Sequence, residues 1–173
     1  MKEDRNFHEE QGFDIPWLKF FLVIMGTFST CVLGYGIYQQ SVVGLPFGKH
    51  PGPTWLLGLV FGIQLLLFAG IFSMLHWMKL ITEIHDGYLF VTFKPLLDRA
   101  IPIRSIRSAE PRTYRPIREY GGWGVRMGGL GNGKAYNAQG NRGVQLVLEN
   151  GDKLLIGSQK PEELALILKG FMN

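Results

Sequence analysis

The segment of residues 128–135 has the sequence Gly-Gly-Leu-Gly-Asn-Gly-Lys-Ala, one residue away from the phosphate-binding P-loop pattern G-x-x-x-x-G-K-[ST]. In that motif the backbone and the lysine hold phosphates, and the final hydroxyl binds Mg²⁺. Here the final position is Ala135, and residues 136–143 do not have the pattern of a helix that could bind phosphate at its N-terminus. We therefore expect no nucleotide hydrolysis, and we interpret residues 121–143 as a long glycine-rich connection between strands.

The other reactive residue types are too scattered to predict a catalytic or metal site. His8, His50, His76 and His85 fall in a tail, a loop, a helix end and a turn, and Cys31 is the single cysteine. No serine lies in a G-x-S-x-G pattern. The sequence therefore predicts a protein that is not an enzyme and that has no metal, no cofactor and no small-molecule substrate.

Basic residues are the second feature that could carry a function. Residues 79–173 contain 14 Lys and Arg against 9 Asp and Glu. Next to an anionic leaflet each basic residue can contribute about 1 kcal/mol of binding, although solvated strand edges would explain the same residues without a function. No nucleic-acid-binding motif accompanies them, so nucleic acid is not an expected partner. The candidate surface for lipid or a protein partner comprises Arg104, Arg107, Arg112, Arg115, Arg118, Trp123, Arg126, Lys134 and Arg142.

Two long uncharged runs, residues 20–48 and 50–78, are separated only by Lys49. A helix of about 20 apolar residues crosses a bilayer, so we expect a transmembrane hairpin over residues 17–78, with helices at 17–38 and 54–77. Residues 1–16 are then a tail, and residues 79–173 form one soluble domain. Lys and Arg gather on the tail and domain side, which predicts a multi-pass protein of the cell (inner) membrane with both termini in the cytoplasm.

The hairpin has the composition of an anchor or a docking surface. Gly58 and Gly62 form a G-x-x-x-G pair, which favours close packing of helices, either within this chain or between two copies. Gln64 is the one strongly polar residue deep in the second helix, and its amide is expected to bond Ser29 or Thr30. A transport path would be expected to contain ionisable groups inside the membrane; we expect none there, because Lys19 can reach the interface and His76 sits at a helix end.

The soluble part has the pattern of a mostly antiparallel sheet. Asp86-Gly87 and Asn150-Gly151 each lie between runs of apolar and β-branched residues, which predicts two hairpins, at residues 80–93 and 143–156. Weaker strands are expected at 99–103, 108–114 and 123–127. Pro161 and the acidic residues that follow it predict a C-terminal helix, whose apolar stripe would be Leu164, Ile167, Leu168 and Phe171.

Strands followed by one C-terminal helix resemble the pleckstrin-homology (PH) superfold. Residues 143–164, Gly-Val-Gln-Leu-Val-Leu-Glu-Asn-Gly-Asp-Lys-Leu-Leu-Ile-Gly-Ser-Gln-Lys-Pro-Glu-Glu-Leu, are similar to the end of bacterial PH-like domains attached to transmembrane hairpins. The resemblance covers residues 79–173 and implies a PH-like antiparallel sheet or barrel, capped by a C-terminal helix, beside a membrane α-hairpin. It implies no catalytic residues. Phosphoinositide-binding PH domains carry basic residues between their first two strands, a loop expected here at His85-Asp86-Gly87.

The leading hypothesis is a membrane-anchored interaction module that binds a protein partner, or a copy of itself, at the inner face of a bacterial membrane. One alternative is binding of anionic membrane lipid by the arginine-rich surface. Another is an accessory subunit of a membrane transport or secretion complex, with Gln64 as the first contact to test.

Overall fold

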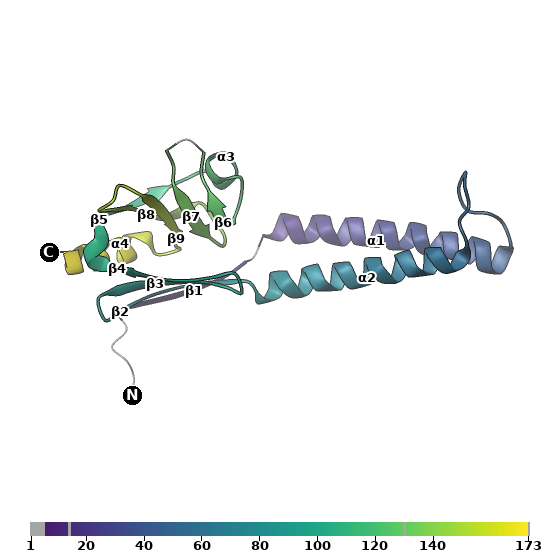
Figure 1. The fold of residues 1–173 in the computed structure, drawn as a ribbon, viewed down its shortest axis with the longest axis horizontal. Helices are drawn as coiled ribbons and strands as arrows, with labels where there is room; N and C mark the ends of the chain where they lie inside the picture. The colour runs from purple at the N-terminus through teal and green to yellow at the C-terminus, as the bar shows by residue number, and fades with distance from the viewer. Residues whose placement is uncertain (1–5, 14, 130, 173) are drawn as a thin grey trace, which may run out of the picture. The chain divides into compact units, whose positions relative to one another are not determined.

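The computed structural model describes residues 6–13, 15–129 and 131–172, and the chain divides into two compact units. One unit is Ile15–Leu75, a hairpin of two helices. The other combines Met1–Asp14 with His76–Asn173 and contains every described strand (Figure 1). We call this second unit the β domain.

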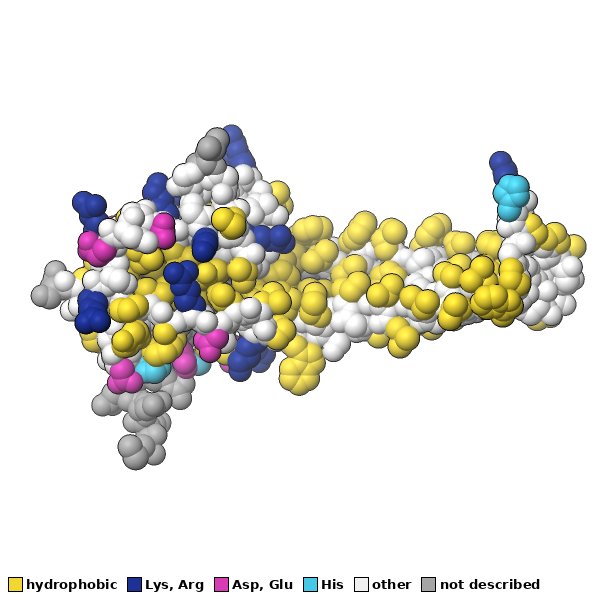
Figure 2. All heavy atoms as spheres, viewed as in Figure 1, with side chains coloured by type: hydrophobic (Ala, Val, Ile, Leu, Met, Phe, Trp, Pro, Cys, Tyr) yellow, Lys and Arg dark blue, Asp and Glu magenta, His cyan; other side chains and the backbone are white. Residues whose placement is uncertain are grey.

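The helical hairpin consists of α1 (Pro16–Tyr38), a π-helical turn (Gln39–Val43) and α2 (Thr54–Trp77). Pro16 occupies the first turn of α1, where its missing N–H costs no hydrogen bond, and Gly44 ends the π-helical turn with φ of 76°. Both helices begin and end within one residue of the predicted limits. Pro16–Val43 and Thr54–Trp77 are long and apolar enough to cross a membrane, and hydrophobic side chains lie along the visible face of the hairpin (Figure 2).

Gln64 joins the two helices, as predicted. Its Nε2 donates to Ser29 Oγ at 2.9 Å and to Thr30 Oγ1 at 3.0 Å. The helices approach closely at Gly26 of α1, where a Cβ would lie 3.1 Å from the Phe68 ring. A Cβ on Gly58 or Gly62 would meet nothing within 4 Å, so the G-x-x-x-G pair takes no part in packing within the chain.

Replacing Gln64 tests the polar contact between the helices. We expect Gln64→Leu to destabilise the hairpin by about 0.6–2 kcal/mol, the range for hydrogen bonds between helices in apolar surroundings. The measurement is unfolding of the detergent-solubilised chain in a titration with SDS. In a chain that already carries Ser29→Ala and Thr30→Ala, the same substitution should cost almost nothing. An equal cost in both backgrounds would contradict the role of the two hydroxyls.

The first sheet contains four antiparallel strands in sequential order: β1 (Phe7–Gly12), β2 (Lys79–His85), β3 (Tyr88–Lys94) and β4 (Leu97–Pro102). The predicted turn between β2 and β3 is confirmed, because Asp86 and Gly87 both have positive φ, 51° and 75°, as a two-residue hairpin turn requires. The prediction of a tail over residues 1–16 does not hold for β1, which pairs with β2 from Phe7↔Ile84 to Gly12↔Lys79.

The second sheet has the strand order β5-β8-β9-β7-β6. The strands are β5 (Ile106–Thr113), β6 (Gly124–Met127), β7 (Lys134–Asn137), β8 (Arg142–Leu148) and β9 (Lys153–Gly157), with a short 3-10 turn at Ile103–Ser105 before β5. All neighbours are antiparallel except β7 and β9, which run parallel. A short helix, α3 (Pro116–Tyr120), follows β5, and the predicted C-terminal helix is α4 (Pro161–Met172).

One hydrophobic core joins the two sheets and α4. Leu80, Val91 and Phe93 from the first sheet belong to the same buried cluster as Val144, Leu146 and Ile156 from the second. Leu164 and Leu168 of α4 complete it, and Ile167 packs against its edge. Phe171, predicted for the same apolar stripe, is largely exposed. Burial of each large apolar side chain contributes about 1.5–3 kcal/mol, so the shared core makes the two sheets one folding unit.

A buried carboxylate fastens β1 to the start of α4. Glu9 is 8% exposed, and it accepts hydrogen bonds from Ser158 Oγ at 2.5 Å and from the Gln159 backbone N–H at 2.7 Å. Gln11 Nε2 donates both to Glu9 Oε1 and to the Gly157 carbonyl, each at 2.9 Å. The inner face of β1 is therefore partly polar, and the Glu9 carboxylate and the Gln11 Nε2 donor are matched to residues that precede α4, while Gln11 Oε1 is buried without a hydrogen-bond partner among the described residues.

Candidate functional site

Residues 114–141, which connect β5 to β8, form a structured insert containing α3, β6 and β7. The sequence predicts a strand at 123–127 and otherwise a glycine-rich connection over 121–143. The structure confirms the strand as β6 and adds β7, which pairs with β6 and, in parallel, with β9. The near-P-loop motif is thus the connection between β6 and β7, and Lys134 begins a strand rather than a helix.

The insert has a small core of its own, made by Tyr114, Tyr120, Ala135 and Leu155. The two tyrosine rings meet edge to face, with centroids 6.0 Å apart. Asn137 is fully buried; its Nδ2 donates to Tyr114 Oη at 3.0 Å, and its Oδ1 accepts from the Gly124 N–H at 2.9 Å. These contacts hold β6 and β7 onto the end of β5.

Tyr114 should make stability depend on alkaline pH. Burial raises the pKa of Tyr114 from 10.0 to about 12, against the opposing effect of the Asn137 hydrogen bond. Because the folded-state pKa is the higher one, this stabilising contribution is complete below pH 10 and is lost as the pH rises through about 12. Burial also raises the pKa of Tyr120, so a titration of tyrosinate absorbance at 295 nm should show late ionisation of which Tyr114→Phe removes the part near pH 12. If all tyrosines ionised together near pH 10, burial of Tyr114 would be contradicted.

The insert exposes apolar and basic side chains together. Ile117 of α3 is 65% exposed, and Val125 and Met127 of β6 are 41% and 79% exposed. β6 is an edge strand with β7 as its single neighbour. Arg115, Arg118 and Arg126 are also exposed. We call this set of six residues the insert face: Arg115, Ile117, Arg118, Val125, Arg126 and Met127. Strand alternation places Val125 and Met127 on one side of β6 and Arg126 on the other.

The structure does not gather all predicted basic residues on one surface. Arg104 lies in the turn before β5, and Arg107 is the second residue of β5. Arg107 has no partner residue in β8, because the register shifts between Ile106 and Ser108. Arg112 and Arg115 lie at the other end of β5, roughly 20 Å away by strand rise. Arg104 lines a separate hollow with Tyr88 and Phe171. The single arginine-rich surface predicted from the sequence is therefore divided.

Several predicted site residues are engaged in structural contacts. Arg112 forms an ion pair with Glu119 and donates to Gln145 Oε1 at 3.3 Å. Arg142 forms an ion pair with Glu162 at the start of α4. Trp123 Nε1 donates to the Gly140 carbonyl at 2.8 Å, and Arg126 Nε donates to the Trp123 carbonyl at 2.9 Å. The contacts of Arg112, Arg142 and Trp123 stabilise the fold, which accounts for these residues without a binding function. Arg115, Arg118 and Arg126 have exposed side chains.

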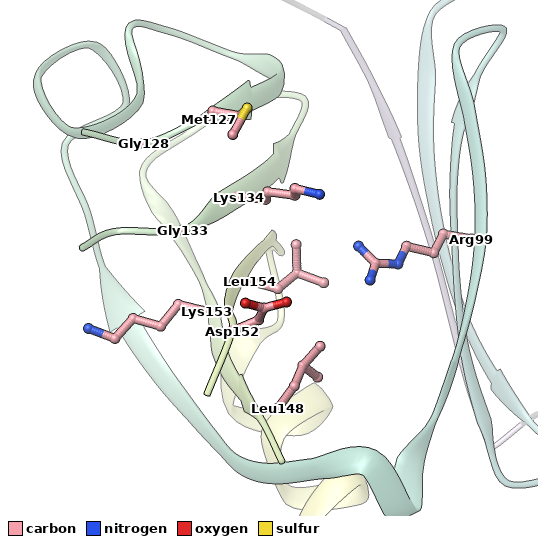
Figure 3. A pocket seen from close by; sticks show the side chains of 9 residues that line it. All are labelled: Arg99, Met127, Gly128, Gly133, Lys134, Leu148, Asp152, Lys153 and Leu154. Atoms are coloured by element: carbon pink, nitrogen blue, oxygen red, sulfur yellow. The ribbon is translucent and has the colours of Figure 1, made fainter. Parts of the chain in front are cut away.

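Lys134 lies in a different place, a cavity of about 310 Å³ between the two sheets. Arg99 of β4 projects into this cavity from the first sheet, and Lys134 of β7 projects toward it from the second (Figure 3). Leu148 and Leu154 supply apolar walls, and Lys153 points away from the cavity (Figure 3). The other lining residues are Met127, Gly128, Gly133 and Asp152.

Arg99 is one of the basic residues of the domain but lies outside the candidate surface that the sequence predicts, which begins at Arg104. Its Nη1 donates to Tyr136 Oη at 3.2 Å, a contact from the first sheet to the second. The sequence feature that could have indicated this cavity is the near-P-loop motif, because its residues Gly128, Gly133 and Lys134 all line the cavity. In the described residues no cluster of three or more His, Cys, Asp or Glu side chains could hold a metal ion.

Comparison with known proteins adds no family to this description. No protein-family model matches the chain, and no curated protein matches it. The features that bear on function are therefore the insert face, the cavity and the helical hairpin.

Proposed function

We propose that the protein is a non-enzymatic interaction module, anchored in the inner membrane of a bacterium, that docks a protein partner through the insert face. The observation that carries the proposal is the exposed edge strand β6. Val125 and Met127 are 41% and 79% exposed on it, and an unpaired strand edge is a template for another strand. Apolar side chains beside a free edge are the combination that a bound strand would cover.

The surroundings of β6 favour a partner with acidic side chains. Arg126 lies in the middle of β6, and Arg115 and Arg118 lie on the neighbouring α3. If two copies paired β6 against β6 about Arg126, like charges would lie directly opposite each other, which destabilises a sheet. An acidic partner strand would meet the same arginines with favourable pairs.

Anchoring by the hairpin is supported by its exposed apolar surface. Leu66, Trp55 and Val42 are each at least 70% exposed within the described structure, which in water would oppose folding. In a bilayer these side chains face lipid. Because Gly12 pairs with Lys79, both ends of the hairpin have to emerge on the same side of the membrane, and the predicted distribution of Lys and Arg assigns that side to the cytoplasm.

The strand order supports a PH-like β domain. The sequential antiparallel strands of the first sheet and the C-terminal helix agree with the antiparallel sheet and helical cap that the resemblance implies, whereas the parallel pair β7·β9 departs from it. Under this proposal β1 is the first strand, and the helical hairpin occupies the connection between the first two strands. The position that carries basic residues in phosphoinositide-binding PH domains is then the hairpin rather than His85-Asp86-Gly87.

Site-specific photocrosslinking in the bacterium tests the docking surface. A photoreactive amino acid at Val125 or Met127 of the full chain should give a recurrent crosslink to one acidic protein, identified by mass spectrometry. The matched control position is Leu96, which is 64% exposed in the turn after β3. Arg126→Glu should abolish the crosslink from Val125, because the charge opposite the partner is reversed.

Three outcomes would overturn this proposal. Crosslinks to lipid alone would favour the second candidate function. A crosslink between two copies of the chain would indicate self-association, for which the outward face at Gly58 and Gly62 is the alternative contact. Equal crosslinking from Leu96, or no effect of Arg126→Glu, would show that the insert face is not a specific dock.

Binding of anionic lipid is the second candidate, and α3 favours it. Ile117 is largely exposed between Arg115 and Arg118, an apolar group among cations that could sit at the headgroup level. In liposomes with anionic lipid, the full chain with Arg115, Arg118 and Arg126 changed to Gln should then lose salt-sensitive protection of the insert from protease. Arg112 is not a useful target, because it pairs with Glu119.

An accessory role in a transport or secretion complex remains a proposal with less support. Gln64, its first expected contact, already donates to Ser29 and Thr30 within the chain. Its amide nitrogen is therefore occupied in the hairpin itself.

A further inference from the structure

The cavity between the sheets directs two positive charges into one space. Arg99 and Lys134 project into it from opposite sheets (Figure 3). Among the described residues no carboxylate forms an ion pair with either of them. Arg99 donates a hydrogen bond to the neutral hydroxyl of Tyr136. Two cations that face each other repel, and the one carboxylate in the lining, that of Asp152, offsets only one of the two charges, so an anion between Arg99 and Lys134 is favoured.

We propose that this cavity binds the phosphate group of an anionic ligand. The guanidinium of Arg99 offers paired N–H donors that match two phosphate oxygens, and the ammonium of Lys134 supplies a compact charge from the other side. Leu148 and Leu154 form an apolar wall for the carbon part of the ligand. A volume of about 310 Å³ lies at the small end of the range for ligand sites, roughly 300–1,000 Å³.

Gly133 explains why the motif is rich in glycine although it is not a P-loop. Its φ is +74°, and a Cβ at this position would lie 2.0 Å from the Lys153 carbonyl oxygen. Only glycine allows the loop to approach β9 this closely, and this approach places Lys134 at the edge of the cavity. The phosphate is therefore held by side chains of two sheets, with no helix N-terminus.

Asp152 limits the charge of the ligand. It is the single acidic residue among those that line the cavity, and its Oδ2 accepts from Asn150 Nδ2 at 2.9 Å. A carboxylate close to the phosphate repels it, so a singly charged phosphodiester fits better than a dianion. Met127 belongs both to the cavity lining and to the insert face, so the two sites are tested separately by changes at residues that belong to only one of them, Lys134 and Arg126.

The chemistry fits two sources, a phospholipid headgroup and a soluble phosphate ester. The test uses the full chain in dodecyl maltoside, a detergent without phosphate, and measures binding by calorimetry. The soluble probes are inorganic phosphate and dimethyl phosphate, a singly charged phosphodiester without a lipid tail. The lipid probe is phosphatidylglycerol in mixed micelles, with uncharged diacylglycerol as its control. Binding of the soluble probes indicates a soluble ester, and binding of phosphatidylglycerol alone indicates a headgroup.

The variants locate the site. We expect Lys134→Gln and Arg99→Gln each to weaken binding by about tenfold or more, the usual effect of losing a hydrogen bond to a charged group. Lys153→Gln removes the same charge from a side chain that points away (Figure 3), and it should change affinity less than threefold. Asp152→Asn should strengthen binding. If Arg99→Gln fails to fold, Lys134→Gln still tests the site, because the Lys134 side chain is exposed and its replacement does not disturb the core.

Two results would overturn the proposal. The first is the absence of saturable binding of all three phosphate probes. The second is an equal loss in Lys153→Gln and Lys134→Gln, which would show a general effect of charge instead of a site at the cavity.

Discussion

Deletion of residues 1–12 is expected to unfold the β domain, although these residues lie far in sequence from the other strands. The deletion removes Phe7, which is 4% exposed in the shared core, the whole ladder between β1 and β2, and the Glu9 contacts to residues before α4. Loss of a buried Phe side chain alone costs about 3–5 kcal/mol. With the ladder and the buried carboxylate, the total reaches about 5 kcal/mol or more, comparable with the stability of a small domain.

Limited proteolysis and hydrogen exchange of the detergent-solubilised chain measure this effect. Deletion of residues 1–5, which precede β1, is the matched control and leaves the β1·β2 ladder in place. A chain of residues 79–173 alone should also fail to fold. In contrast, a chain in which a short glycine-containing turn replaces residues 15–76 should fold without detergent, because Phe13 N–H already bonds the Met78 carbonyl at 3.0 Å, and a two-residue turn can close such a pair of strands. Native-like protection in residues 79–173 alone would refute the role of β1.

The structural elements that were predicted are those whose signal is local. The Asp86-Gly87 turn depends on two adjacent residues that accept positive φ, and the helices at Pro16–Tyr38 and Thr54–Trp77 depend on long apolar runs. The contact of Gln64 with Ser29 and Thr30 was predictable because a polar group in an apolar helix needs a partner, and the facing helix offers few.

β1 was not predictable from its own pattern. Its alternation, Phe7-His8-Glu9-Glu10-Gln11-Gly12, places a carboxylate and an amide on the inner face. Buried polar groups are acceptable only when they are hydrogen-bonded, and the partners of Glu9 and Gln11 lie at residues 157–159, near the other end of the chain. A strand whose inner face depends on such distant partners resembles a polar tail in sequence.

The candidate sites depend on non-local pairing in the same way. Arg99 and Lys134 are on different sheets and share a cavity only because β7 adds in parallel to β9. The near-P-loop motif indicated an unusual loop, but the physical reason for its glycine at 133 is the Lys153 carbonyl across the sheet. Charge composition alone predicted a single basic surface, because composition contains no information about which arginines pair with Glu119 or Glu162.

The β1 strand connects two parts of the chain that are far from it in sequence, β2 and the residues before α4. Residues on both sides of the hairpin, Gly12 and Lys79, are paired in the sheet, and β1 is also bonded to the start of α4. The insert and α4 follow the hairpin in sequence, yet the strand that precedes the hairpin holds the first sheet and α4 together. The domain can therefore complete its fold only after both helices have been made and residues 79–173 have followed.

Glu9→Ala should be the most destabilising single substitution of a charged residue in the β domain. It leaves Ser158 Oγ, the Gln159 N–H and Gln11 Nε2 without the carboxylate that accepts from them, and each buried unsatisfied group costs about 1–3 kcal/mol. It also removes a negative charge from the N-terminus of α4, where the helix dipole favours one. We expect a loss of about 3 kcal/mol after partial relaxation, measured by denaturant unfolding of the full chain in detergent.

Glu9→Gln and Glu10→Gln separate hydrogen bonding from charge. Glu9→Gln keeps one acceptor oxygen but turns an amide donor toward groups that already donate, so it should still lose a substantial part of the stability. Glu10→Gln makes the same change of charge one residue away, where the side chain is exposed and pairs with Lys79 at 2.6 Å, and it should change the unfolding midpoint little. Equal effects of the two substitutions would show that Glu9 acts through net charge, and the connection between β1 and α4 would then have to rest on Phe7 and the strand ladder alone.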